Sequence, residues 1–312
     1  MTDTPRRSGG LTVAGYRVGA AMSRLVPNVF TDLVSAGIGT PAAIVNVDKR
    51  RMAERHMARA VPQASRARHR RLAAEVFDNY ARYYLESFRL PTTSPDDVAR
   101  SFTIDGFEHV TGALDGGKGA LVALPHLGGW EWAGRWITDQ GLPMTVVVEP
   151  LEPPELFRWF VDLRRRFGMN VVPLGPDAGA EVLGALRRNE IVCLLSDRFI
   201  SGASVVVEFL GERTLLPAGP ATLAVRTGAP LLPTAVYFHG RGNGHHAVVR
   251  PPLDTQRSTD SLRSDVRRIT QDLADELGRL IRRAPEQWHL LQPNWPSDPG
   301  WPHGSLDHPT TD

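Results

Sequence analysis

The sequence predicts an α/β protein in which a central, largely parallel sheet is flanked by helices and preceded by a helical N-terminal region. Three observations favour this fold. From about residue 103 onward, short runs rich in Val, Leu and Ile alternate with amphipathic segments of helical length. These runs are continuously apolar, which is typical of parallel strands covered by helices on both faces. In the first hundred residues, by contrast, apolar side chains recur at helical spacing.

The N-terminal region, residues 1–100, is expected to be helical and to associate with a membrane. Residues 11–47 are apolar, but glycines and Pro41 interrupt them, so no stretch reaches the roughly 20 apolar residues of a transmembrane helix. Residues 48–71 carry nine Lys or Arg against two acids. An apolar segment followed by a basic one suits an interfacial anchor on anionic lipid. A solvated helix face would show the same pattern.

Residues 101–292 are predicted to form the α/β core, and residues 293–312 a loose tail rich in Pro, Gly and His. A helix over residues 72–88, with aromatic side chains along one face, precedes this core. The predicted strands cover residues 119–124, 144–148, 170–173, 190–196 and 205–210, and residues 230–238 and 246–249 form a predicted hairpin. The predicted helices cover residues 130–139, 154–168, 178–188, 217–227 and 260–283.

The composition excludes several classes of protein. Apolar content of 42% and charged content of 22% are globular values, which argue against disorder. The single cysteine, Cys193, excludes an internal disulfide and a cysteine-based zinc site, and its apolar surroundings favour packing over catalysis. A net charge of +2 without a recognisable module argues against nucleic-acid binding. The N-terminus lacks the apolar segment of a signal peptide, so we expect a peripheral protein on the cytosolic face of the plasma membrane.

Three ionisable residues directly follow apolar runs that are predicted to be strands. They are His126, Glu149 and Asp197. In an open parallel sheet, binding and catalytic sites form beyond the carboxyl ends of the strands. The coincidence of three such residues therefore predicts a site at this edge.

The segment from Pro125 to Glu131 contains the sharpest pattern. His126 and Glu131 are five residues apart, so on one continuous helix they would point away from each other. They can meet if His126 lies in a turn and Glu131 in the first helical turn, and Gly128-Gly129 permits such a turn. A carboxylate on one ring nitrogen would leave the other free to take a proton. The alternative is that the two side chains never touch.

Two arginines are candidates for anion binding. Arg164 lies on the apolar stripe of the helix over residues 154–168, and an arginine on a buried face needs an anion. A phosphate of the substrate or a carboxylate such as Glu149 would serve, and an internal ion pair is the structural alternative. Arg198, next to Asp197, has the same two interpretations.

A histidine that is separated from an acid by four residues, directly after a strand, resembles the signature of glycerolipid-type acyltransferases. More specifically, Pro125-His-Leu-Gly-Gly-Trp-Glu131 resembles the branch that contains lipid A late acyltransferases and actinobacterial phosphatidylinositol mannoside acyltransferases. The resemblance covers about residues 100–295, and its further matches are Asp197-Arg198 and residues 207–212, 217–224 and 285–288. The scarcity of lysine, typical of GC-rich actinobacterial genomes, and the lack of a full transmembrane segment favour the mannoside type.

The resemblance implies an O-acyltransferase that moves a long-chain acyl group, palmitoyl in the mannoside type, from acyl-CoA to a mannose hydroxyl of phosphatidylinositol mannoside. We expect His126 to be the general base and Glu131 the carboxylate that orients it, with no acyl-enzyme, metal or cofactor besides the co-substrate acyl-CoA. Peptide N–H groups around Gly128 and Gly129, at the start of a helix, would stabilise the oxyanion. The expected substrate-binding residues are Gly128, Glu149, Arg164, Asp197 and Arg198.

The acyl chain needs an apolar groove, and the aromatic helix over residues 80–88 is one possible wall. Several alternatives stay open on the sequence alone. The same pair of residues could activate water in an acyl-thioester hydrolase, the acceptor could be another lipid, or the donor could be an acyl carrier protein. A lipid-binding scaffold that retains a degenerate site is the non-enzymatic alternative.

Overall fold

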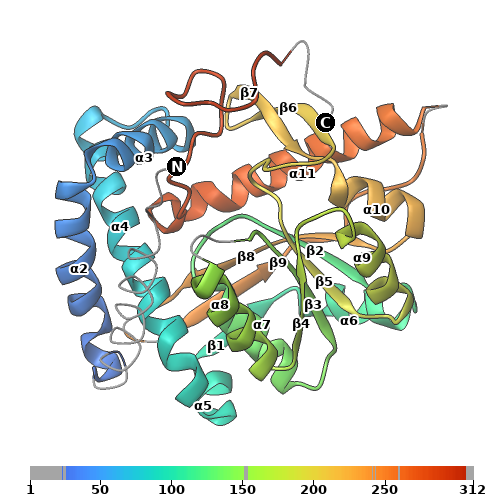
Figure 1. The fold of residues 1–312 in the computed structure, drawn as a ribbon, viewed down its shortest axis with the longest axis horizontal. Coiled ribbons are helices and arrows are strands. Elements are labelled where there is room, and N and C mark those ends of the chain that lie inside the picture. Colours follow the sequence, from blue (N-terminus) through green and yellow to red (C-terminus); the bar gives the residue numbers. More distant parts are fainter. Residues whose placement is uncertain are drawn as a thin grey trace, which may run out of the picture.

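A computed structural model describes residues 23, 26–150, 154–240, 242, 244–258 and 261–306. Most of the first half of the apolar segment expected over residues 11–47 lies outside the described residues. In the described part of the chain, a helical layer stands beside an α/β core, as predicted (Figure 1).

The core is built on a seven-stranded sheet with the order β1-β9-β8-β2-β5-β3-β4. Neighbouring strands run parallel, except for the antiparallel pair β8 and β9. The strands are β1 (Phe102–Asp105), β2 (Ala120–Leu124), β3 (Met144–Val148), β4 (Met169–Pro173), β5 (Ile191–Leu195), β8 (Leu231–Phe238) and β9 (His245–Val249). All residues of β2 and β8 are buried, which explains their continuously apolar sequences.

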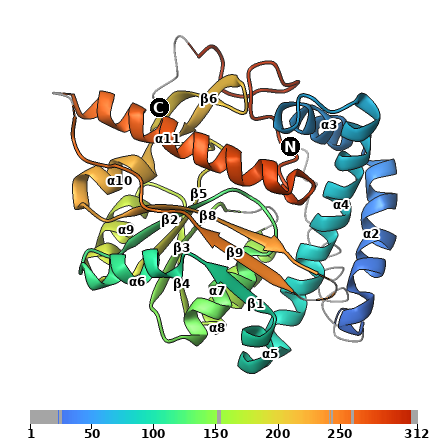
Figure 2. The ribbon, with the colours of Figure 1, turned by 180° about the vertical axis from the view of Figure 1, so that it is seen from behind.

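Helices cover both faces of this sheet (Figures 1 and 2). One face packs against α9 (Ala178–Arg187), α10 (Gly219–Thr227) and α11 (Leu262–Arg283). The other packs against α6 (Phe107–Asp115), α7 (Trp130–Asp139) and α8 (Pro154–Arg166), with α5 (Pro95–Arg100) beside α7. The predicted doubly covered parallel sheet is therefore confirmed.

The N-terminal layer consists of a short 3-10 helix (Asn28–Phe30), α2 (Thr31–Val45), α3 (Val47–Ala60) and α4 (Arg66–Arg89). Small side chains spaced one helical turn apart form the buried face of α2, namely Thr31, Ser35, Gly39 and Ala43. A Cβ atom on Gly39 would lie 2.5 Å from the backbone of Phe77 and Asp78, so glycine is what allows α2 to approach α4 this closely. Residues 90–92 continue α4 as a 3-10 turn.

Two regions differ from the sequence prediction. The sequence analysis missed β1 and placed a helix start at Pro217, but Pro217 ends strand β7 (Glu212–Pro217). This strand pairs antiparallel with β6 (Ser204–Phe209), outside the main sheet. The hairpin turn uses positive φ angles at Leu210 and Gly211. The glycine suits this backbone conformation, and α10 starts two residues after the strand.

The expectation of a loose tail from residue 293 was wrong for its first residues. Trp295 is fully buried, and the carboxylate of Asp298 accepts hydrogen bonds from the backbone amides of Asn294 and Trp295. Asp298 also contacts Arg59 at 2.8 Å, Arg55 at 3.1 Å and His56 at 3.5 Å, all on α3. The buried carboxylate of Asp298 therefore links the tail to the N-terminal layer. Composition does not reveal a long-range contact of this kind.

Replacing Asp298 by Asn should lower the free energy of unfolding by about 3 kcal/mol, because buried cations lose their counter-charge. Burial alone would raise the pKa of Asp298, but contacts with His56, the Asn294 amide and Arg59 outweigh it and hold the pKa below its usual range. The stabilisation is therefore present above the unfolded-state pKa of about 4 and disappears as the pH falls through the folded-state pKa.

Urea unfolding between pH 7 and pH 2 measures this effect. In acid, the free energy of unfolding of the wild-type protein should fall to that of Asp298→Asn. The exposed control Asp115→Asn should change the free energy of unfolding by less than about 0.5 kcal/mol. Equal stability of wild type and Asp298→Asn at pH 7 would contradict the assignment.

Candidate active site

His126 and Asp197 form a hydrogen-bonded pair at the carboxyl ends of two central strands. Strands β2 and β5 are parallel neighbours in which Leu124 lies opposite Leu195, so the residues that follow them meet at the same edge. The His126 Nδ1 atom lies 2.7 Å from Asp197 Oδ1. The backbone N–H of His126 donates to the other carboxylate oxygen at 3.0 Å. The two predicted strand-end residues are therefore brought together.

The carboxylate of Asp197 is fixed on its remaining side by the C-terminal segment. The indole N–H of Trp288 donates to Asp197 Oδ2 at 2.7 Å, and the Asn294 amide donates to the backbone carbonyl of Asp197 at 2.9 Å. Burial alone would raise the pKa of Asp197, but His126 and Trp288 outweigh it, so its pKa lies below the usual range. An ionised carboxylate against Nδ1 keeps the proton on Nδ1 and leaves Nε2 as the proton acceptor.

The expectation that Glu131 orients His126 was wrong in its geometry. Glu131 is 3% exposed and contacts Arg164, with Nε to carboxylate distances of 3.1 and 3.2 Å. It also accepts a hydrogen bond of 3.0 Å from the hydroxyl of Tyr83 on α4. The carboxylate that occupies Nδ1 of His126 comes from the adjacent strand instead. Arg164 thus forms the internal ion pair that was the alternative to a substrate phosphate.

The turn after His126 explains why Glu131 points elsewhere. Gly128 has a φ of +63°, and a Cβ atom there would lie 1.9 Å from the carbonyl oxygen of Val236. Helix α7 begins two residues later, so Glu131 falls in its first turn and faces α4 and α8. The amide of Gly128 donates to the Gln287 carbonyl at 3.0 Å. The oxyanion role expected of this amide is therefore not supported, and its role is to hold the turn.

A cavity of about 870 Å³ opens beside His126. Glu149 and Arg198 line it and form an ion pair of 3.3 Å with each other. Both were expected to bind substrate, and both lie in a position to meet a ligand at His126. Asp197 does not share that position, because its side chain is fully buried behind the imidazole.

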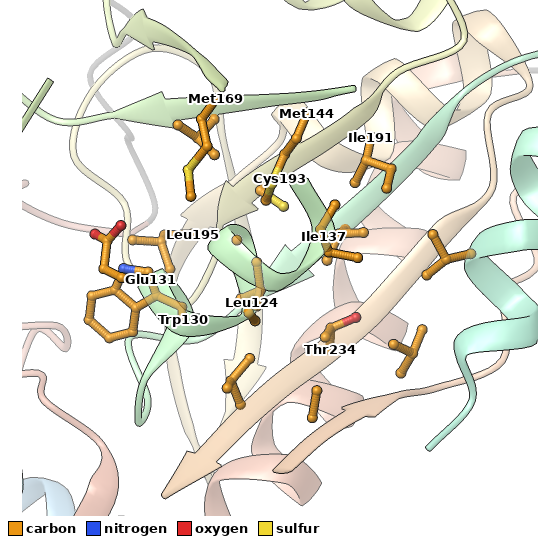
Figure 3. A pocket seen from close by; sticks show the side chains of 18 of the residues that line it. Leu124, Trp130, Glu131, Ile137, Met144, Met169, Ile191, Cys193, Leu195 and Thr234 are labelled. Carbon is orange, nitrogen blue, oxygen red and sulfur yellow. The ribbon is translucent and has the colours of Figure 1, made fainter. Parts of the chain in front are cut away.

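A second, apolar cavity of about 830 Å³ lies between the sheet and α6 and α7. Figure 3 shows Glu131 and Trp130 at one end of its lining and Ile137, Ile191 and Thr234 toward the other. The two cavities share Val147, Val148 and Leu195 at the ends of β3 and β5. The described lining contains no residue of α4, whose residues 80–88 had been suggested as one possible wall of an acyl groove.

Cys193 faces the apolar cavity, where burial raises the pKa of its thiol to about 12. At neutral pH it is a neutral, apolar lining residue, because the thiolate is the nucleophilic form.

The sequence analysis missed residues of the C-terminal segment that complete the site. Trp288 and Asn294 hold Asp197, and the backbone N–H of His289 donates to the His126 carbonyl at 2.7 Å. Burial, followed by repulsion from His126, lowers the pKa of His289 to about 3, so its imidazole is neutral. Residues 285–288 had been noted as part of the resemblance, but no local pattern gave their contact with the strand ends.

Replacing Glu131 by Gln should lower the free energy of unfolding by about 3 kcal/mol, because Arg164 is left as an unpaired buried charge. The double variant Glu131→Gln/Arg164→Met removes both charges and should recover much of that loss. Urea unfolding of the wild type, both single variants and the double variant measures the coupling. Strictly additive losses would show that the two side chains do not depend on each other.

Comparison with known proteins shows the family of this chain. The family model described as bacterial lipid A biosynthesis acyltransferase matches residues 10–297. The chain is 43% identical to a protein of Mycobacterium tuberculosis named phosphatidylinositol mannoside acyltransferase. The matching 232 residues cover 73% of this chain and 71% of the relative. It is 38% identical over 293 residues to the protein of that name from Mycolicibacterium smegmatis, covering 93% of each chain.

A lipid A biosynthesis acyltransferase of Haemophilus influenzae is more distant, at 24% identity over 186 residues, which is 59% of this chain and 55% of the relative. The family match spans the N-terminal layer, both cavities and the segment that holds Asp197. The chain belongs to the bacterial lipid A biosynthesis acyltransferase family, whose members acylate lipids.

Proposed function

We propose that this enzyme transfers a long-chain acyl group, of palmitoyl length, from acyl-CoA to a mannose hydroxyl of phosphatidylinositol mannoside. The observation that carries the proposal is the His126–Asp197 pair, because His126 lines a largely apolar cavity that adjoins a second apolar cavity at Val147, Val148 and Leu195. The names of the mycobacterial relatives support the acceptor. The apolar cavity, whose lining includes Cys193 and Met144, offers an environment that suits an acyl chain.

In the proposed mechanism, His126 Nε2 removes the proton of the acceptor hydroxyl as that oxygen attacks the thioester carbonyl. Asp197 holds the imidazole in the required tautomer and stabilises its charged form. Collapse of the tetrahedral intermediate forms the ester and expels the CoA thiolate, which takes the proton from His126. In the first turn of α7 the N–H of Trp132 donates to the Gly129 carbonyl at 3.0 Å, so the preceding N–H groups, those of Trp130 and Glu131, are the proposed oxyanion donors.

Glu149 and Arg198 are the proposed contacts of the acceptor. Both line the cavity with His126, and their side chains are partly exposed, at 33% and 19%. A carboxylate accepts hydrogen bonds from sugar hydroxyls, whereas a guanidinium donates to hydroxyls and phosphate. This pair therefore matches the two kinds of polar group in a phosphorylated glycolipid.

Replacing His126 by Ala should reduce kcat/KM for acyl transfer by about 10²- to 10⁴-fold, because the general base is lost. Asp197→Asn should cost at least about 10²-fold, because an amide cannot hold the same tautomer. Since the two residues act as a unit, the double variant should be little worse than His126→Ala alone. The assay follows radiolabelled palmitoyl-CoA and mannosylated phosphatidylinositol, with His239→Ala as a control histidine outside the site.

The same assay separates transfer from hydrolysis. Labelled glycolipid from the wild-type enzyme supports the transferase, whereas release of free palmitate alone would replace it with a thioesterase. Full activity in folded His126→Ala would exclude the mechanism.

We further propose that α2 docks on the cytosolic face of the plasma membrane. Every large apolar side chain that is exposed in the described part of the chain lies in or next to this helix: Val29, Phe30, Leu33, Ile38, Ile44, Val45 and Val47. Leu33 is 70% and Val45 76% exposed. The basic residues of α3 follow directly and suit anionic lipid.

An in-plane position agrees better with the packing than a span does. Within the described residues, Asn28–Val45 is long and apolar enough to cross a membrane by length and composition. One face of α2, however, is closed against α4 by Ser35, Gly39 and Ala43. The opposite face is then the part available to lipid, as in interfacial helices.

The double variant Leu33→Ser/Ile38→Ser should weaken binding to anionic vesicles by roughly 100-fold, because each side chain contributes about 1.5 kcal/mol when buried in the acyl boundary. The control Leu33→Met/Ile38→Met keeps both positions apolar and should bind as the wild type does. Vesicle co-sedimentation measures binding, and circular dichroism checks the fold. Unchanged binding of the serine variant would place the membrane contact elsewhere.

A further inference from the structure

His245, the first residue of β9, is a buried ionisable residue that the proposed mechanism does not use. Its imidazole is fully buried, and Nε2 lies 2.9 Å from a carboxylate oxygen of Glu86 on α4. The ring stacks on the indole of Trp132 in α7, with the ring centres 4.6 Å apart and the planes inclined by 14°. Burying an ionisable group is costly unless it is paired, and Glu86 supplies the partner. The imidazole is therefore held in one position from two sides.

The His245 ring packs against the turn that joins β2 to α7. Gly129 is the N-cap residue of this helix, with a φ of −107°. A negative φ does not select for glycine, so the backbone conformation is not the reason for this residue. A Cβ atom here would lie 2.5 Å from both Cδ2 and Nε2 of His245. The missing side chain at Gly129 is therefore what lets the imidazole reach the backbone of the turn.

The two glycines of the turn meet the β8–β9 hairpin in different ways. Gly128 approaches the backbone of β8, and its positive φ already favours glycine. Gly129 approaches a side chain instead, and this side chain can be replaced while the backbone of the hairpin stays the same. The contact between Gly129 and His245 can therefore be tested separately from the rest of the turn.

This contact falls on a peptide that the proposed mechanism uses. The peptide between Gly129 and Trp130 carries the N–H of Trp130, one of the two proposed oxyanion donors. The N–H of Glu131, the other donor, belongs to the next peptide. Such donors stabilise an oxyanion when they are fixed in place before the reaction, and a displacement of about 1 Å can cost about 10²-fold in rate. A side chain that fixes Gly129 therefore acts on the rate of the chemical step.

Helix α4 supports the start of α7 at two points about one helical turn apart. Tyr83 donates to Glu131 at 3.0 Å, and Glu86 contacts His245. The Glu86 carboxylate is held in turn by Nε of Arg82 at 2.7 Å. Figure 2 shows α4 beside the ends of β8 and β9, which allows one helix to make both contacts.

We propose that His245 is a positioning residue for acyl transfer. Paired with Glu86, it holds Gly129 and so orients the N–H groups at the start of α7 toward the oxyanion. His245 is not among the described residues that line the two large cavities, so it acts through the turn and not by touching substrate. This inference rests on the proposed transferase function.

The test is a cycle of Gly129→Ala, His245→Ala and the double variant, assayed with palmitoyl-CoA and mannosylated phosphatidylinositol. Gly129→Ala should lower kcat about 10²-fold, because the new Cβ atom collides with the imidazole and displaces the turn. His245→Ala should lower kcat about tenfold, because the turn is held less firmly. In the double variant the added methyl group enters the space of the missing ring, so kcat should recover to that of His245→Ala. KM for both substrates should change less than about threefold.

Two further variants separate positioning from folding. His245→Gln keeps an N–H donor near the position of Nε2 and should retain kcat within about threefold. The matched control His246→Ala removes the next histidine along β9, which contacts Asp105 at 3.2 Å, and should leave kcat unchanged. Circular dichroism checks the fold of every variant.

Amide hydrogen exchange gives a readout that does not need catalysis. The N–H of Trp132 donates to the Gly129 carbonyl, so in His245→Ala it should exchange at least about tenfold faster, whereas amides of α9 should not change. Additive losses of kcat in the double variant, or unchanged exchange at Trp132, would overturn the role of His245. Absence of transfer by the wild-type enzyme, with the expected exchange pattern present, would instead refute the transferase itself.

Discussion

The carboxylate of Asp197 is the constraint on which the candidate site depends. It contacts the ring and the backbone N–H of His126 and accepts the indole N–H of Trp288. A fully buried carboxylate is tolerated in the ionised form when such donors surround it. Two central strands and the C-terminal segment must therefore all be in place before His126 can present its free nitrogen. The same requirement explains why Asn294 and Trp295 are buried, although their sequence is rich in proline.

Asp197, and not the expected Glu131, contacts His126, which shows the limit of local sequence patterns. Glu131 is close to His126 along the chain, and Asp197 is 71 residues away. In a parallel sheet, however, two residues that follow neighbouring strands lie closer together than a residue in the turn after one strand and a residue in the helix that follows this turn. The position of β5 beside β2 follows from the whole sheet order, in which β3 and β4 lie farther out. No local spacing encodes that order, so the sequence indicated the three strand-end residues but not their pairing.

Much of the fold was predictable because hydrophobic runs directly report strands that are buried on both faces. Helix α7 and strand β3 have the predicted bounds, residues 130–139 and 144–148. Strand β1 was missed because Phe102–Asp105 is a short edge strand that mixes apolar and polar residues. Strand β7 was missed because it follows a two-residue turn and leads directly into α10. The packing of Arg164 against Glu131 was one of two open alternatives, and the choice required the position of α8 relative to α7.

Helix α4 connects the two halves of the molecule physically. Its Tyr83 donates to Glu131 at the end of the apolar cavity, and its Arg82 contacts Asp32 of α2 at 3.0 Å. Arg82 also pairs with Glu86, which in turn contacts His245 of β9 at 2.9 Å. On the proposed orientation, lipid meets the exposed apolar side chains of α2, which α4 connects to the α/β core. His126 lines the cavity that adjoins the apolar cavity at Val147, Val148 and Leu195. The contacts of α4 therefore link the helix proposed to meet lipid with the ion pair of Glu131 at one end of the apolar cavity, so the membrane-facing layer and the candidate site are held in one rigid arrangement.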